Sequence, residues 1–249
     1  GDLSPERDVE IVRTELLLAD LATAERALEK RRKDVARGDK DAAPAAEVLE
    51  RAAGMLDEGT ELRKAGLADR EIEALEPYAF LTLKDVVYIA NVSERDAGEG
   101  SASWEERLAA SLGEPPGRVV ALAATLESEL AELAPAERDE FLAAWSIGEP
   151  GLARLVRAAN EILDIVTFYT IKGTEVRAWT VPAGTGVAAA AGKIHTDMEQ
   201  GFIKAEVVSF DDLVAAGSMH AAREAGRVRI EGRDHVVLDG DVILVHFRA

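Results

Sequence analysis

Two polar side chains near residue 91 have the chemistry to recognise a nucleobase. Asn91 ends an apolar run, residues 85–90, that is typical of a buried parallel strand, and Glu94 lies three residues further on. An asparagine amide offers a donor and an acceptor together, which suits the edge of a purine. The alternative is that Asn91 caps the end of the strand and Glu94 is a solvated loop residue.

A basic cluster near residue 31 is a second candidate. Its seven members lie within fifteen positions: Arg26, Lys30, Arg31, Arg32, Lys33, Arg37 and Lys40. Such a cluster could contact phosphates, with Arg31, Arg32 and Lys33 at its centre. It could equally be the solvated end of a helix, where cations interact favourably with the helix dipole.

The last third of the chain holds weaker candidates. Lys193 and Lys204 are basic side chains that could contact RNA, and Phe202 beside Lys204 could stack on a base or pack in a core. His195 and Asp197 resemble an acid–base pair, but no nucleophile accompanies them, so we expect a structural role. We expect no catalytic residue, and no metal site at His220 or His235.

The elements that position these residues fall into three segments. Residues 1–82 predict a long helix from Pro5 to about Arg37, capped by Ser4, and a second helix over 44–64. The polar turn between the two helices predicts an antiparallel helical hairpin with the basic cluster at its tip. A short helix over 69–80 closes the segment.

Residues 83–165 predict two buried strands, 85–91 and 119–123, alternating with helices. A capping box at Ser103 predicts a helix to about residue 112, and further helices are expected over 126–133, 135–145 and 152–163. This pattern is half of a doubly wound α/β sheet, so we expect an incomplete nucleotide-binding domain whose other strands lie outside this chain or in a partner.

Residues 166–249 change to strand patterns separated by Gly and Asp turns. Strands are expected over 166–171, 175–181, 202–209, 227–230 and 242–247, with short helices over 187–191, 211–215 and 219–225. A mixed sheet crossed by one or two short helices fits a small β-grasp domain. The expected architecture is therefore α/β and multidomain.

Composition narrows the class of protein. The chain has 249 residues, no cysteine and a net charge of −18, which argues against a general nucleic-acid coat protein. Residues 166–249 carry only −2 of that charge, so this segment could approach an anionic partner. Neither a signal peptide nor a membrane-spanning run is evident, and we expect a cytoplasmic protein.

Several motifs together resemble the YchF/Obg-like ATPase family, over essentially the whole chain. The C-terminal ones are Glu-Val-Arg-Ala-Trp-Thr at 175–180, Gly-Lys-Ile-His-Thr-Asp at 192–197, Gly-Phe-Ile-Lys-Ala-Glu at 201–206 and Asp-Gly-Asp-Val-Ile at 239–243. They are similar to the family's TGS domain, which is a β-grasp (ubiquitin-like) fold. Residues 8–29 resemble the entry to its helical insert, and Tyr-Ile-Ala-Asn-Val-Ser-Glu at 88–94 resembles its base-recognition motif.

The resemblance implies roles for particular residues. Asn91 and Glu94 would contact the base, with the longer Glu94 favouring ATP over GTP, and the backbone of Val92 would flank the adenine. Ala123 and Ala124 align with the second base-side loop, where Ser-Ala is usual, so a side-chain contact is lost at Ala123. The resemblance also implies association with the ribosome or rRNA.

The family's phosphate-binding loop, a Gly-rich turn ending in Lys and Ser, does not occur in this sequence. The chain is similar to the latter two-thirds of the family, whose members use ATP with Mg²⁺. Without the loop amides, the lysine and the Mg²⁺-binding hydroxyl, we expect this chain alone not to hydrolyse nucleotide and to bind adenine nucleotide weakly. The alternative function is a non-catalytic TGS-containing adaptor that binds RNA or ribosomes.

Overall fold

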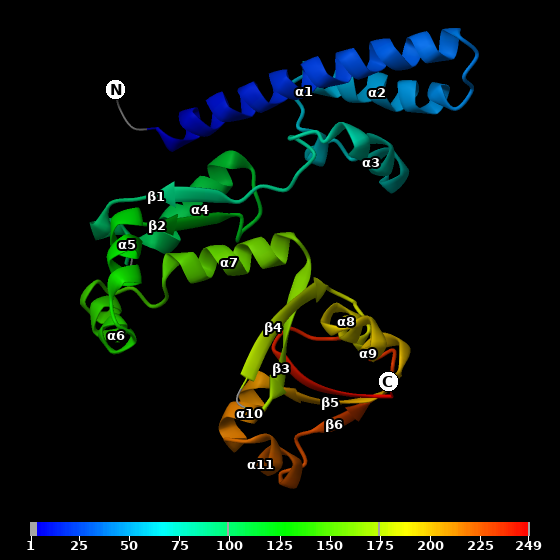
Figure 1. Cartoon of the computed structure of the whole chain (residues 1–249). Helices are drawn as coiled ribbons and strands as arrows, with labels where there is room; N and C mark the ends of the chain where they lie inside the picture. The colour runs from blue at the N-terminus through cyan, green and yellow to red at the C-terminus, as the bar shows by residue number, and fades with distance from the viewer. Residues whose placement is uncertain (1–3, 99, 174, 249) are drawn as a thin grey trace. The chain divides into compact units, whose positions relative to one another are not determined.

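The computed structural model describes residues 4–98, 100–173 and 175–248. The chain has a mixed α/β fold and divides into two compact units at Leu155/Val156 (Figure 1). Helix α7, Gly151–Ile162, contains this boundary. Each unit is described by itself, and the three-segment division at residues 82 and 165 stays a prediction.

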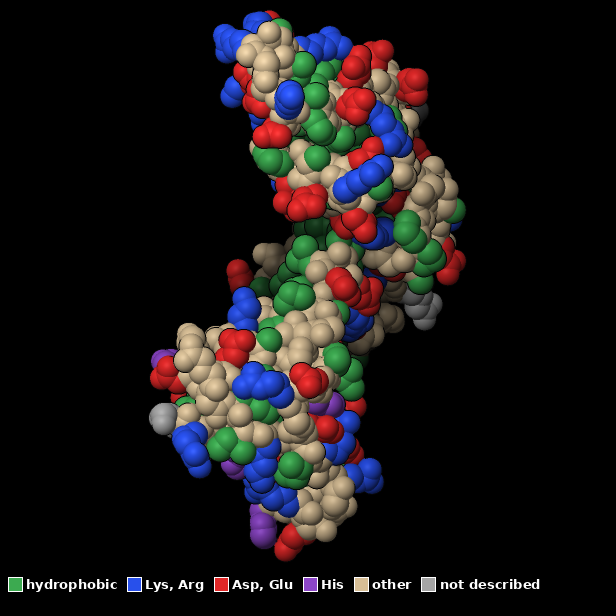
Figure 2. Space-filling model, turned by 90° about the vertical axis from the view of Figure 1, so that its right-hand side faces the viewer, with side chains coloured by type: hydrophobic (Ala, Val, Ile, Leu, Met, Phe, Trp, Pro, Cys, Tyr) green, Lys and Arg blue, Asp and Glu red, His purple; other side chains and the backbone are tan. Residues whose placement is uncertain are grey.

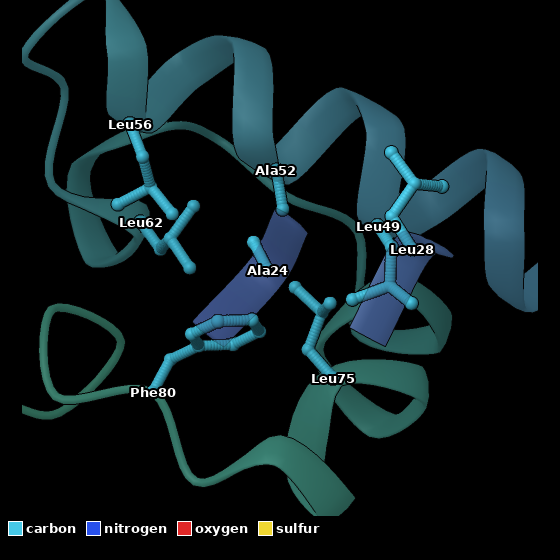
Figure 3. Close-up of a cluster of buried hydrophobic side chains, with 8 residues drawn as sticks. All are labelled: Ala24, Leu28, Leu49, Ala52, Leu56, Leu62, Leu75 and Phe80. Carbon is cyan, nitrogen blue, oxygen red and sulfur yellow. The ribbon is translucent and has the colours of Figure 1, made fainter. Parts of the chain in front are cut away.

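The first unit opens with two packed helices. Helix α1 spans Pro5–Ala36, and the Ser4 side chain accepts a hydrogen bond from the Arg7 backbone N–H at its start. Helix α2 spans Ala42–Asp57. Apolar side chains of α1 and α2 meet those of the following segment in one buried cluster (Figure 3): Ala24, Leu28, Leu49, Ala52, Leu56, Leu62, Leu75 and Phe80. The predicted helical hairpin is therefore held together by burial of apolar surface.

The prediction that the second helix continues to Lys64 is wrong. Helix α2 ends at Asp57, and Gly59 follows with φ of 78°, a left-handed conformation that glycine adopts readily. The chain then forms a 3₁₀ turn η1, Leu62–Lys64, and helix α3, Asp69–Leu75, followed by a second 3₁₀ turn η2, Glu76–Tyr78.

Asp20 of α1 holds the chain at residues 81–82 against that helix. Its carboxylate is buried and accepts hydrogen bonds from the backbone N–H groups of Leu81, at 2.9 Å, and Thr82, at 2.7 Å. A buried carboxylate is tolerated where backbone donors satisfy its oxygens. The contact sets where the chain leaves the hairpin toward the strands.

The rest of the unit contains a two-stranded parallel sheet. Strand β1, Tyr88–Asn91, pairs with β2, Val119–Leu122, so that Asn91 lies opposite Leu122. The surrounding elements are η3 (Glu94–Asp96), α4 (Ser101–Leu112), α5 (Ala124–Glu132) and α6 (Pro135–Ala144).

Two predictions in this region are wrong. Strand β1 begins at Tyr88 rather than residue 85, and it is half-exposed, since Ile89 keeps 52% of its surface in solvent. Helix α4 begins at Ser101 after Gly100, so Ser103 is an interior residue and forms no capping box.

An ionic cluster around the buried carboxylate of Glu114 joins the helical segment to the strands within this unit. One carboxylate oxygen of Glu114 lies 2.7 Å from Arg13 Nη2, 2.6 Å from Arg63 Nη2 and 2.7 Å from Lys64 Nζ. The Tyr88 hydroxyl, at the start of β1, donates to the same oxygen at 3.2 Å. Burial raises the pKa of Glu114, but hydrogen bonds from Arg63 and Lys64 outweigh it and lower the pKa to about 2.

The second unit is built on a five-stranded mixed sheet in the order β4-β3-β7-β5-β6. The strands are β3 (Ile165–Lys172), β4 (Glu175–Pro182), β5 (Phe202–Ser209), β6 (Arg229–Glu231) and β7 (Asp241–Phe247). The first and last strands, β3 and β7, are parallel neighbours, whereas the other pairs are antiparallel.

Four helices complete this unit: α8 (Val187–Ile194), α9 (Thr196–Gln200), α10 (Phe210–Ala216) and α11 (Met219–Glu224). Phe168, Val181, Val187 and Ala205 share one core, to which α8 contributes. A second core involves Val208, Val242 and Ala222, to which α11 contributes. All five predicted strands are present, although β6 begins at Arg229 rather than 227, and α9 was not predicted.

Candidate functional site

The loops after β1 and β2 meet at the predicted base-recognition residues. Asn91 is the last residue of β1, and its Oδ1 accepts a hydrogen bond from the Ala124 backbone N–H at 3.1 Å. The Val92 N–H donates to the Leu122 carbonyl at 2.9 Å. These two bonds hold the end of β1 against the last residue of β2 and the first residue of α5, as expected where the carboxyl ends of parallel strands lie side by side.

Glu94 is joined to the same loop by a contact that sequence analysis missed. The Thr125 hydroxyl donates a hydrogen bond to Glu94 Oε1 at 3.1 Å. A depression of about 500 Å³ lies here, lined by Asn91, Val92, Ser93, Glu94, Arg95, Ala124 and Thr125. The signal in the sequence was a hydroxyl residue directly after Ala123-Ala124, the loop already expected to face the base.

Ala123 lies apart from the other predicted site residues, and its role beside a base stays a prediction. The residue is 2% exposed and packs with Ala97 and Leu126, and it is not among the residues that line the depression. Ala123 instead ends the buried stretch that begins in β2. The other four predicted residues (Asn91, Val92, Glu94 and Ala124) all line the depression.

The basic cluster on α1 is partly neutralised by the hairpin itself. Arg32 forms an ion pair with Glu50 at 2.8 Å, and Lys33 one with Glu29 at 2.6 Å. Arg31 makes a different contact, because its Nε donates to the Tyr78 hydroxyl at 3.1 Å. The three predicted RNA-contact residues therefore have different electrostatic surroundings.

Charge on the face shown in Figure 2 is mixed. Basic and acidic side chains alternate over the face in view in Figure 2, with no large patch of one sign. Lys193, at the end of α8, and Lys204, in β5, are both exposed. They belong to the second unit, whereas Arg31, Arg32 and Lys33 belong to the first.

Three side chains of the second unit have structural partners: His195, Trp179 and Phe202. His195 Nδ1 accepts a hydrogen bond from the Asp197 backbone N–H at 3.2 Å and caps α9. Trp179 Nε1 donates to the Thr170 hydroxyl at 3.0 Å, and Phe202 packs against the Phe168 core. Within residues 4–98, 100–173 and 175–248, no group of three acidic or histidine side chains is arranged to hold a metal ion.

Among the described residues, no helix is both long enough and apolar enough to span a bilayer.

Comparison with known proteins identifies the class. A family model described as "YchF-GTPase_C: Protein of unknown function (DUF933)" matches residues 165–248. Of the curated relatives, "Ribosome-binding ATPase YchF" of Escherichia coli O157:H7 is 43% identical over 245 residues, which are 98% of this chain and 66% of that protein. The protein of the same name from Haemophilus influenzae is 42% identical, and the match covers 100% of this chain and 67% of that protein. "Obg-like ATPase 1" of Bos taurus is 35% identical, and the match covers 99% of this chain and 63% of that protein.

Solved structures agree. The Schizosaccharomyces pombe YchF GTPase superimposes with a TM-score of 0.80 at 28% identity, over 99% of this chain and 67% of that one. A GTP-binding protein from Pyrococcus horikoshii, at 17% identity and a TM-score of 0.56, shares the fold.

The chain therefore belongs to the YchF/Obg-like ATPase family. It spans about two thirds of the length of the curated relatives that it matches.

Proposed function

We propose that this chain supplies the base-recognition and docking parts of a ribosome-associated ATPase. The observation that carries the proposal is the depression where Asn91, Glu94 and Thr125 converge from two strand ends. Relatives over nearly the whole chain are named ribosome-binding ATPases, which supports both the nucleotide and the partner.

The hydrogen bonds of the depression suggest how a base would be read. Asn91 Oδ1 is occupied by the Ala124 N–H, which leaves the amide NH₂ to donate to a purine ring nitrogen. Glu94 is an acceptor, and the exocyclic amine at position 6 of adenine is a donor, whereas guanine has a carbonyl there. The carboxylate therefore favours adenine at this edge, and ATP over GTP.

The phosphates would be held elsewhere. The residues that line the depression include no lysine and no glycine-rich turn, and no phosphate-loop motif occurs in the sequence. Ile89 is half-exposed on a sheet of two strands, which supports the proposal that further strands complete this sheet. We propose that residues 1–249 alone do not hydrolyse ATP and that Mg²⁺ is bound by groups outside them.

The second unit is proposed to be a TGS domain of β-grasp topology that docks on rRNA or a ribosomal protein. Its parallel central pair β3–β7, antiparallel flanks and crossing helix α8 support that topology. Lys193 and Lys204, together with Arg31, Arg32 and Lys33 of the hairpin, are the proposed contacts. The alternative is an adaptor that keeps this docking role without any nucleotide.

A thermal-shift titration with ATP and with GTP distinguishes the two functions. Ligand that binds only the folded chain raises its melting temperature, and at about ten times Kd the gain is about 1.4 kcal/mol. The proposal predicts a shift with ATP that exceeds the shift with GTP and is lost in Asn91→Ala. A matched control, Glu140→Gln on α6, should keep it. No shift with either nucleotide, together with salt-sensitive ribosome binding, would favour the adaptor.

A further inference from the structure

The outer edge of β4 is open in the second unit. Strand β4 stands at one end of the five-strand order and pairs only with β3 among the described strands. It is eight residues long, whereas β6 at the opposite edge has three. Proteins commonly protect sheet edges by keeping them short, so a long exposed edge presents an unpaired row of backbone donors and acceptors.

A cavity of about 490 Å³ lies beside this edge. Strands β3, β4 and β7 contribute Thr170, Trp179 and Val245 to its lining, and Ile194 and Met198 contribute from α8 and α9. Its size falls within the roughly 300–1,000 Å³ of pockets that hold ligands. The apolar lining suits a bulky apolar group, and the Thr170 hydroxyl is already bonded to Trp179.

The polar part of the cavity is neutral as a whole. Glu175 and Arg177 line it from β4 and pair with each other at 2.6 Å. Both side chains are more than half exposed, so the pair can part at little cost. A strongly anionic ligand such as a phosphate chain would meet both a carboxylate and a guanidinium here, which disfavours it.

We propose that β4 and this cavity bind an extended peptide segment of a partner protein by strand addition. The peptide backbone pairs with the open edge of β4, and one large apolar side chain enters the cavity between Trp179 and Met198. An extended peptide is the occupant because its donors and acceptors repeat with the period of the strand, while alternate side chains point to one face. This peptide site rests on no part of the nucleotide proposal, and it adds a defined surface and ligand to the docking role proposed for the second unit.

The test uses the 249-residue chain and a phage-displayed library of random dodecapeptides. We expect enrichment of peptides with a central aromatic or large aliphatic residue. In NMR spectra the best peptide should shift the amides of residues 175–181 and the Met198 methyl group. Met198→Ala should weaken its binding about fivefold or more, whereas Ile230→Ala on the short edge β6 should change it less than about twofold.

Alternate N-methylation of the peptide tests strand addition without altering the protein. Methylating every second amide removes the donors on one edge of an extended peptide, so one of the two alternating sets should abolish binding and the other should leave it. Equal effects of both sets, shifts mapped to other residues, or no enriched peptide would overturn the proposal. Dimers of the chain that shift the same amides would also overturn it, because the occupant would then be a second copy.

Discussion

The Thr125 hydroxyl donates a hydrogen bond to the Glu94 carboxylate at 3.1 Å and so joins the first turn of α5 to the loop after β1. The two residues are 31 positions apart in the sequence. A carboxylate held by a side chain of α5 has fewer orientations to lose when a base binds. Thr125 is therefore proposed to position Glu94 for the exocyclic amine of adenine.

Replacing this hydroxyl should weaken base discrimination. Thr125→Val removes the hydrogen bond at nearly constant volume, and a bond of this kind contributes about 0.5–1.5 kcal/mol. We expect the ratio of ATP to GTP affinity to fall by roughly two- to tenfold, as measured by titration. Thr125→Ser keeps the donor and serves as the control; a ratio that falls equally in both variants would count against the positioning role.

Neutralising Glu114 should destabilise the first unit. Its side chain is 1% exposed and interacts with Arg13, Arg63 and Lys64, so Glu114→Gln removes a buried counter-charge from these partly exposed cations, which keep Glu61 as a carboxylate partner. Removing one partner of a fully buried pair costs about 3 kcal/mol or more, and the partial exposure of these cations reduces the expected loss to about 1–3 kcal/mol. Urea unfolding should show this loss, whereas exposed Glu132→Gln on α5 should stay within about 0.5 kcal/mol. A loss below about 1 kcal/mol in Glu114→Gln would mean that the cluster is not a determinant of stability.

Stability should fall in acid through the same residue. The pKa of Glu114 in the folded chain is about 2, compared with an unperturbed value of 4.5. Its contribution is therefore complete above about pH 4.5 and is lost as the pH falls toward 2. A difference of this size corresponds to about 3 kcal/mol.

Glu206 should contribute in the same direction, because the hydrogen bond from Arg223 lowers its pKa. Urea midpoints measured between pH 7 and pH 3 check this dependence. The Glu114→Gln variant should show a shallower decline below pH 4.5 than the original chain; parallel declines would exclude Glu114 as the titrating group.

The salt dependence of ribosome or rRNA binding should decrease with each hairpin cation that is removed. Each lysine or arginine that neutralises a phosphate contributes about one unit to the slope of log affinity against log salt. Replacing Arg31 and Lys33 together by alanine should reduce the slope by about two. Glu29→Gln should strengthen binding, because Lys33 then keeps no carboxylate partner at 2.6 Å.

Folding of the double variant must be checked, since Arg31 also donates to the Tyr78 hydroxyl. An unchanged melting temperature with an unchanged salt slope would show that the hairpin does not contact phosphates. Binding would then have to reside in the second unit, where Lys193→Ala and Lys204→Ala make the equivalent test.

Sequence patterns were sufficient to predict those elements whose structure is decided by residues close together in the chain. The Ser4-Pro5 start of α1 and the alternation that predicted β3, β4, β5 and β7 were confirmed. The end of α2 was missed because helices tolerate a single glycine within a helical pattern of apolar residues. Here Gly59 adopts a positive φ, and the helix ends before it.

The positions of the candidate site residues could be predicted only in part, for a different reason. Asn91 and Glu94 are close in sequence and follow a strand, so their place at a strand end could be inferred. The burial of Ala123 and the contact of Thr125 with Glu94 depend on how β2 and α5 pack against β1. No local pattern specifies that packing.

The most direct test of the central claim is an NMR titration of the ¹⁵N-labelled chain with AMP and with GMP. These monophosphates lack the β- and γ-phosphates that a phosphate loop binds, so their affinity depends mainly on recognition of the base. The account predicts saturable shifts confined to the backbone amides of residues 91–95 and 124–125, stronger with AMP, and lost in Asn91→Ala. Tighter binding of GMP at these amides, or no AMP-dependent shift at them at millimolar concentration, would contradict it.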